Sequence, residues 1–151
     1  MTESLPMTPE AALAGPGIRV LFSAQQIAAR VREMGLEIAR DLEGQRPVFV
    51  GVLKGASMFQ CDLARATPLD LTLDYLSVSS YGAGTTSSGT VRLVSDLRND
   101  IAGAHVVICE GVVDSGLTLT FILDLLRSRN PASVRVATLL DRKSTRLNSS
   151  H

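Results

Sequence analysis

Apolar residues in this chain fall into two patterns, short continuous runs and longer stretches with helical spacing. A continuous apolar run bounded by turn residues is typical of a strand covered on both faces, whereas apolar residues three and four apart are typical of an amphipathic helix. The expected strands are 47–53, 69–78, 91–94, 106–109 and 134–140, and the expected helices run from Ser23 to near Gly44, from 57 to 65 and from 117 to 129. Because strands and helices alternate, the sequence predicts an α/β fold with a mostly parallel twisted sheet and flanking helices.

A group of polar residues lies between the expected strand 106–109 and the helix that follows it, in a strand-to-helix turn where parallel sheets bind ligands. Ser115, Gly116 and Thr118 can offer hydroxyls and backbone N–H groups at a helix start, which favours a bound phosphate. Glu110 and Asp114 cannot help to bind a bare phosphate. Their carboxylates indicate a ligand with sugar hydroxyls, a magnesium ion or a proton to be moved. The alternative is an ordinary turn of a doubly wound sheet with solvated acidic side chains.

A second turn follows the expected strand 47–53, where Lys54 and Gly55 precede the helix 57–65. Because carboxyl ends of parallel strands meet at one edge of a sheet, both turns are expected to converge on one crevice. A Lys-Gly pair alone is weak support for a site, since most such lysines are solvated.

Small polar residues dominate the stretch 79–89 between the extended segments 69–78 and 91–94. Composition alone predicts a flexible hairpin connection here.

The composition fits one domain with a core that needs no disulfides: 151 residues, 45% hydrophobic and 20% charged. The formal net charge is zero and no Lys/Arg cluster stands out, so neither a nucleic-acid partner nor a membrane surface is expected. Cys61 and Cys109 lie in expected apolar elements, which favours buried, reduced thiols over a bridge. No apolar run is long enough to span a bilayer and no signal pattern begins the chain, so the cytoplasm is the expected compartment.

The residues from Glu110 to Thr118 follow the order acidic, any, two apolar, Asp, Ser or Thr, Gly, any, Thr. This order resembles the phosphoribosyl-pyrophosphate (PRPP) binding motif of the type I phosphoribosyltransferases. The resemblance implies that Glu110 reaches the ribose hydroxyls and, indirectly, a Mg²⁺ ion, and that Asp114 is the catalytic residue near purine N7. It further implies a binding site for the 5′-phosphate made by Asp114, Ser115, Gly116, Leu117 and Thr118.

Two other segments resemble the same family. Leu53, Lys54 and Gly55 resemble the pyrophosphate-binding loop of hypoxanthine and guanine phosphoribosyltransferases, in which the Leu-Lys peptide is often cis. Ser80 and Tyr81 resemble the start of the mobile loop that closes over the substrates. By this resemblance Tyr81 is the apolar cap and Ser80 a donor to pyrophosphate, and closure keeps water away from an oxocarbenium-like state.

The sequence departs from the family pattern in several places. The family usually has a second acidic residue after the first, and here Gly111 takes that position, so one ribose or magnesium-linked contact is lost. Arg142 stands where the family has a lysine that contacts the purine's six-position oxygen. We expect a disordered leader at 1–17, a phosphoribosyltransferase core at 18–141, and a non-native tail at 142–151 that replaces the family's closing segment. A natural short tail is the alternative.

The resemblance implies an enzyme of purine salvage that transfers the phosphoribosyl group from PRPP to hypoxanthine, guanine or both, with Mg²⁺. It also implies a homo-oligomer, a dimer or a tetramer. Three alternatives stay open: a regulatory module that binds PRPP or a nucleotide, a transferase of the same fold acting on orotate or xanthine, and an inactive truncated fragment.

Overall fold

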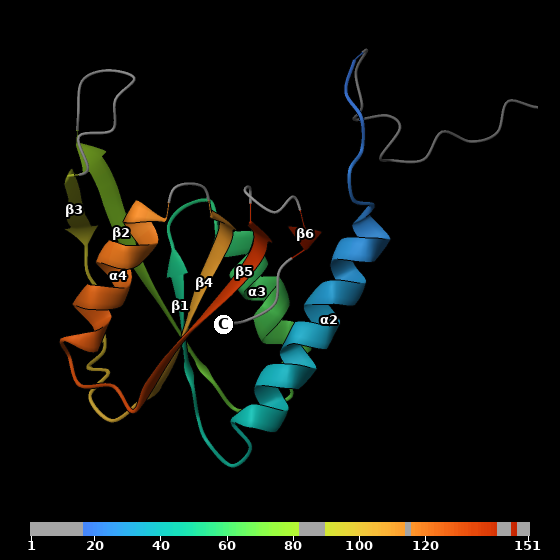
Figure 1. The fold of residues 1–151 in the computed structure, drawn as a ribbon. Coiled ribbons are helices and arrows are strands. Elements are labelled where there is room, and N and C mark those ends of the chain that lie inside the picture. The colour runs from blue at the N-terminus through green and yellow to red at the C-terminus, as the bar shows by residue number, and fades with distance from the viewer. Residues whose placement is uncertain (1–16, 82–89, 114–115, 142–145, 148–151) are drawn as a thin grey trace, which may run out of the picture.

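The computed structural model describes residues 17–81, 90–113, 116–141 and 146–147. Its elements are α2 (Ala24–Asp41), β1 (Val48–Val52), α3 (Ser57–Ala66), β2 (Thr72–Tyr81), β3 (Thr90–Ser95), β4 (His105–Val113), α4 (Leu117–Arg127), β5 (Ser133–Asp141) and β6 (Arg146–Leu147). They form a three-layer α/β structure around one sheet with strand order β3-β2-β1-β4-β5-β6 (Figure 1). The expected α/β fold is therefore confirmed.

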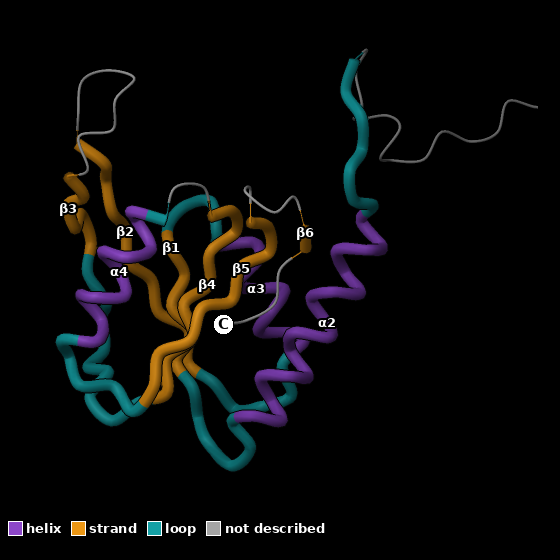
Figure 2. Tube along the Cα trace, viewed as in Figure 1, coloured by secondary structure: helices purple, strands orange, loops and turns teal. Residues whose placement is uncertain are grey.

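The centre of the sheet is parallel and its two outer strands are antiparallel. Strand β1 pairs in parallel with β2 on one side and β4 on the other, and β4 pairs in parallel with β5. Strands β3 and β6 pair antiparallel with β2 and β5. The carboxyl ends of β1, β2, β4 and β5 thus share one edge of the sheet, which the arrowheads of Figure 1 mark and which Figure 2 shows from the same side.

The two faces of the sheet carry separate apolar cores. All five residues of β1 are buried, and alternate side chains enter opposite layers. Helix α4 covers one face through Ile122 and Leu126, and α2 and α3 cover the other through residues such as Met34 and Leu63 (Figure 1). Alternation along a strand covered on both faces explains the continuous apolar runs of the sequence.

Helix α2 begins with the predicted capping box. The backbone N–H of Gln26 donates to Ser23 Oγ at 3.1 Å, and the Ser23 N–H donates to Gln26 Oε1 at 2.8 Å. Two of the helix's first N–H groups need such partners, and these side chains provide them.

Several predicted boundaries are wrong. Glu110 lies inside β4 and not in the turn, because β4 continues to pair with β5 as far as Val113, opposite Asp141. Ser80 and Tyr81 lie in β2 and not in a loop, because β2 pairs with β3 up to Tyr81, opposite Thr90. In both places the strand continues through residues whose polar composition alone indicates a loop.

Helices α2 and α4 end earlier than expected, at Asp41 and Arg127. After α4 the N–H of Asn130 donates to Arg127 O at 3.3 Å, and Asn130 then adopts a φ of 56° that stops the helix. The segment expected to stand outside the fold also contributes, since β6 pairs with Leu140 and Asp141 of β5.

Both cysteines are free, as expected. Cys109 is buried, whereas Cys61 is only partly buried. Within the described ranges no helix has both the length and the apolar character to cross a bilayer.

Candidate functional site

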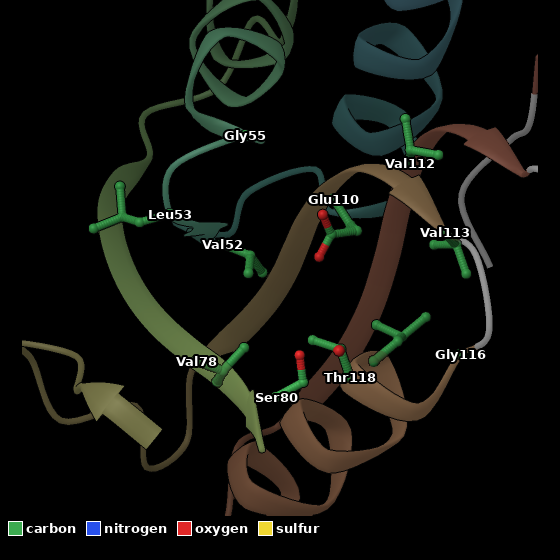
Figure 3. Close-up of a pocket in the computed structure, with 11 residues that line it drawn as sticks. Val52, Leu53, Gly55, Val78, Ser80, Glu110, Val112, Val113, Gly116 and Thr118 are labelled. Atoms are coloured by element: carbon green, nitrogen blue, oxygen red, sulfur yellow. The ribbon is translucent and has the colours of Figure 1, made fainter. Parts of the chain in front are cut away.

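A pocket of about 280 Å³ opens at the edge of the sheet where the parallel strands end (Figure 3). Three separate parts of the chain form its walls: the end of β1 and the turn after it, the end of β2, and the segment from β4 into α4. The lining residues are Val52, Leu53, Gly55, Val78, Ser80, Glu110, Val112, Val113, Gly116, Thr118 and Leu119. Polar side chains of Glu110, Ser80 and Thr118 point into the same space (Figure 3).

The turn after β1 contributes Leu53 and Gly55 to the pocket, whereas Lys54 is exposed and is not among the residues that line it. The Leu53–Lys54 peptide is cis, as the resemblance led us to expect. The carbonyl oxygen of Lys54 accepts hydrogen bonds from Ser57 N (3.2 Å) and Ser57 Oγ (2.8 Å), which tie the turn to the start of α3.

The start of α4 forms the opposite wall. Gly116 precedes the helix with φ 78° and ψ −6°, a left-handed conformation that favours glycine. Gly116 itself has no side chain that could cap this end of α4. The first N–H groups of a helix lack intrahelical partners, and the helix dipole places partial positive charge there, so this wall suits an anionic ligand.

Glu110 supplies the negative charge of the pocket and is the single ionisable side chain among the described lining residues. Burial raises the pKa of Glu110 to about 7, an effect that the hydrogen bond from the Gly111 backbone partly offsets. A carboxylate that is so poorly solvated gains from hydroxyl donors or a cation brought by a ligand.

Gly111 follows Glu110 and faces the turn after β1. A Cβ built at Gly111 has only the carbonyl oxygen of Gly55 within 4 Å, at 3.7 Å, which is an ordinary contact. The strand therefore has room for a side chain at the position where the family usually carries its second acid.

The predicted site residues are only partly brought together. Leu53, Gly55, Ser80, Glu110, Gly116 and Thr118 line the pocket, and Leu117 is 44% exposed outside it. Asp114, Ser115 and Arg142 lie outside the described residues, as does the side chain of Tyr81.

Sequence reasoning missed the apolar part of the lining, namely Val52, Val78, Val112, Val113 and Leu119. Strand alternation could have found one of them, because Val78 stands two residues before Ser80 on the same face of β2. Val112 and Val113 follow from how far β4 extends, which the sequence pattern does not show.

A second, largely apolar pocket of about 440 Å³ lies beside the first. Val112, which is 53% exposed, lines both pockets. The other residues that line the second pocket are Arg19, Val20, Leu21, Phe22, Ile27, Leu140 and Asp141.

Comparison with known proteins agrees with this architecture. A family model described as a phosphoribosyl transferase domain matches residues 19–151, and the chain belongs to this family. The resemblance to the phosphoribosyltransferases is thereby confirmed.

The relatives include hypoxanthine and hypoxanthine-guanine phosphoribosyltransferases. The chain is 50% identical over 127 residues to the hypoxanthine-guanine phosphoribosyltransferase of Mycobacterium tuberculosis (strain H37Rv), with 80% of this chain and 63% of the relative covered. It is 40% identical over 128 residues to that of Bacillus subtilis, with 85% and 71% covered. The crystal structure of a Staphylococcus aureus hypoxanthine phosphoribosyltransferase superposes with a TM-score of 0.80 at 37% identity, covering 87% of this chain and 71% of that chain.

The match does not extend over the whole of these relatives. The chain spans 63% of the length of the Mycobacterium tuberculosis relative and 20% of the bifunctional protein TilS/HprT of Listeria monocytogenes.

Proposed function

We propose that this chain binds PRPP in the pocket between β1, β2 and α4 and transfers its phosphoribosyl group to hypoxanthine, guanine or both, in purine salvage. The observation that carries the proposal is the placement of a half-buried carboxylate, Glu110, across a pocket from the start of α4. A ligand with an anionic group and sugar hydroxyls matches both walls at once.

The 5′-phosphate belongs at the start of α4, in the segment Asp114–Thr118. Helix N–H groups and the hydroxyls of Ser115 and Thr118 are the donors that a phosphate accepts. The ribose then reaches Glu110, whose carboxylate accepts hydrogen bonds from adjacent hydroxyls. Leu53, Lys54 and Gly55 take the pyrophosphate, with Ser80 as a further donor and Tyr81 as an apolar cover.

Mg²⁺ fits this site as an ion that enters with the substrate. Among the described residues no group of three or more His, Cys, Asp or Glu could hold a metal by itself. Mg²⁺ usually takes one or two carboxylates together with substrate phosphates and waters, and Glu110 offers one carboxylate. The ion supplies positive charge that stabilises the departing pyrophosphate.

The base belongs in the apolar pocket that shares Val112 with the PRPP pocket, because a planar purine buries its faces against apolar side chains. Purine N9 attacks C1′ of the ribose, and the bond from C1′ to the pyrophosphate oxygen breaks. The Asp114 carboxylate takes the proton from N7, and Arg142 faces the six-position oxygen. Holding both substrates in line supplies most of the acceleration.

Self-association, as a dimer or a tetramer, is part of the proposal. Met58 on α3 and Leu36 on α2 are 78% and 59% exposed, and burying large apolar side chains between copies is favourable. Sedimentation analysis at several protein concentrations tests it, and a monomer throughout would overturn this part.

Calorimetric titration of the chain with Mg²⁺-PRPP, followed by a hypoxanthine-dependent pyrophosphate assay, tests the function. Glu110→Gln should weaken binding by roughly tenfold, because an amide is a poorer acceptor than a carboxylate. Asp114→Asn should remove turnover and leave binding within about fivefold. Saturable binding without turnover in the unmodified chain would overturn transfer, and absence of binding by a folded sample would overturn the pocket assignment itself.

A further inference from the structure

Asp74 of β2 is a buried carboxylate outside the pocket, and each of its two oxygens accepts two hydrogen bonds. It is 3% exposed. Its Oδ1 accepts from Tyr75 N at 2.8 Å and Arg98 N at 3.1 Å, and its Oδ2 accepts from Asn99 N at 3.0 Å and Asn99 Nδ2 at 3.2 Å. Three of the four donors belong to the turn 96–100, so Asp74 fastens this turn to β2.

The position of Asp74 gives these bonds a specific mechanical role. Backbone pairing between β2 and β3 ends at Ser77 and Ser95, next to a shift of register at Ser77/Val78. Beyond that point the Asp74 side chain connects β2 to the chain leaving β3. The root of the β2–β3 hairpin is therefore held by a side chain where the backbone ladder has stopped.

The same turn is also tied to α4. Arg129, just after the helix, donates from Nη1 to Asp96 Oδ1 at 2.8 Å and from Nη2 to Asp96 Oδ2 at 2.7 Å. The hydrogen bond from Arg129 lowers the pKa of Asp96, so this bidentate pair stays charged at neutral pH. The turn 96–100 thus joins the two elements that face each other across the pocket: β2, which carries Ser80, and α4, whose first turn carries Thr118.

We propose that Asp74 is a positioning residue for the PRPP pocket, which holds the turn 96–100 on β2 and, through the Asp96–Arg129 pair, fixes β2 relative to α4. The inference rests on the proposed function for its ligand, and on the hydrogen bonds alone for its mechanics. A ligand that spans both walls binds best when their separation is already set.

Asp74→Asn is the main test, with Asp100→Asn as its matched control in the same turn. An amide at position 74 would point its NH₂ group at groups that are themselves N–H donors. Asp100 is exposed, and its Oδ1 accepts a hydrogen bond only from Ala102 N, at 3.0 Å, among the bonds described. We expect Asp74→Asn to weaken Mg²⁺-PRPP binding by roughly tenfold and Asp100→Asn to leave it within twofold. Titration is carried out at a temperature where circular dichroism shows each sample fully folded.

A second set of variants removes the Asp96–Arg129 ion pair, whose loss leaves the apolar core intact. Asp96→Asn, Arg129→Gln and the double variant should each weaken binding by about threefold, with the double variant no worse than either single one, because they break one shared link. Their melting temperatures should change little, since exposed ion pairs contribute little to stability. A change in melting temperature with unaltered affinity in every variant would show a purely structural role and overturn the inference.

Hydrogen exchange separates this inference from the proposed function. In Asp74→Asn, amides of 77–80 and 116–120 should exchange faster together, while those of β5 stay protected. If the unmodified chain fails to bind PRPP, the proposed function fails, and this exchange pattern alone decides whether Asp74 links the two walls. Faster exchange confined to 96–100 would contradict the link.

Discussion

On one face of the sheet α2, α3 and β1 approach one another closely at two glycines, whereas the face under α4 is left open at one end. On the first face Gly35 of α2 lies directly against the backbone of Ala66, and Gly51 of β1 lies directly against Gln60. On the second face one helix and the β2–β3 hairpin leave room for the pocket. The comparison teaches that the first face provides the scaffold and that the second keeps space and polar side chains for a ligand.

The largest expected effect uses the same substitution on both sides of this comparison. In Gly35→Ala the new Cβ collides with the carbonyl group of Ala66, so the helices must separate and the free energy of unfolding should fall by about 2–4 kcal/mol. Gly111→Ala, whose Cβ meets one oxygen at 3.7 Å, should change it by less than about 0.5 kcal/mol. Urea denaturation measures both, and equal losses would contradict the difference between the faces.

The next effect concerns the pH dependence of stability. Because the folded chain raises the pKa of Glu110 from 4.5 to about 7, the native state binds this proton more tightly than the unfolded state. The resulting stability is complete below pH 4.5 and is lost as the pH rises to about 7. Glu110→Gln should therefore be more stable than the unmodified chain at pH 8, by about 1–2 kcal/mol after allowance for partial solvent exposure.

Denaturation of Glu110→Gln at pH 4 and pH 8 checks this, with Glu43→Gln on the surface as control. The Glu110 variant should gain stability only at the higher pH, while its PRPP affinity falls. A loss of stability at pH 8 would show that the carboxylate already has a strong partner in the ligand-free protein.

On the open face, Gly111→Asp should give a smaller effect, an increase in ligand affinity. The site has room for the side chain, and a second carboxylate near the ribose should tighten Mg²⁺-PRPP binding by about 1 kcal/mol, roughly fivefold. The control, Gly111→Asn, introduces a side chain of the same size as aspartate but without the charge, and it should change the Mg²⁺-PRPP affinity by less than twofold. Unchanged affinity in the aspartate variant at saturating magnesium would argue against placing this position beside the ribose.

The smallest effect should stay on the scaffold. Ser23→Ala removes the side chain that caps α2 and should lower the free energy of unfolding by about 0.5 kcal/mol, with PRPP affinity unchanged. Ser128→Ala, after α4, removes a hydroxyl bonded to Leu125 O at 2.6 Å and serves as a control outside any N-terminal cap. Thermal unfolding measures both. Weaker PRPP binding in the Ser23 variant would show that α2 also shapes the pocket.

The sequence alone predicted the structure correctly where an element depends on a few neighbouring residues. Ser23 and Gln26 predicted the start of α2, and continuous apolar runs predicted the buried strands, because capping and burial act over a few residues. The glycine before α4 was also foreseen within its motif.

The sequence was insufficient where distant pairing decides the outcome. Glu110 and Ser80 are strand residues because β5 and β3 extend alongside them, and nothing within either segment encodes that length. The hydrogen bonds of Asp74 are hidden from the sequence for the same reason, since three of its four donors lie 24 or 25 residues further along the chain.

The central position of β1 in the sheet has a consequence for how the chain folds into its ligand-binding state. Val48 pairs with Thr72 on one side and with Val106 on the other, so the middle of the sheet is completed only after a large part of the chain has been synthesised. Contacts so distant in sequence form slowly, and the pocket needs all of them. Ligand binding is therefore a late event in folding, and a ligand present during refolding should draw the last step to completion by mass action.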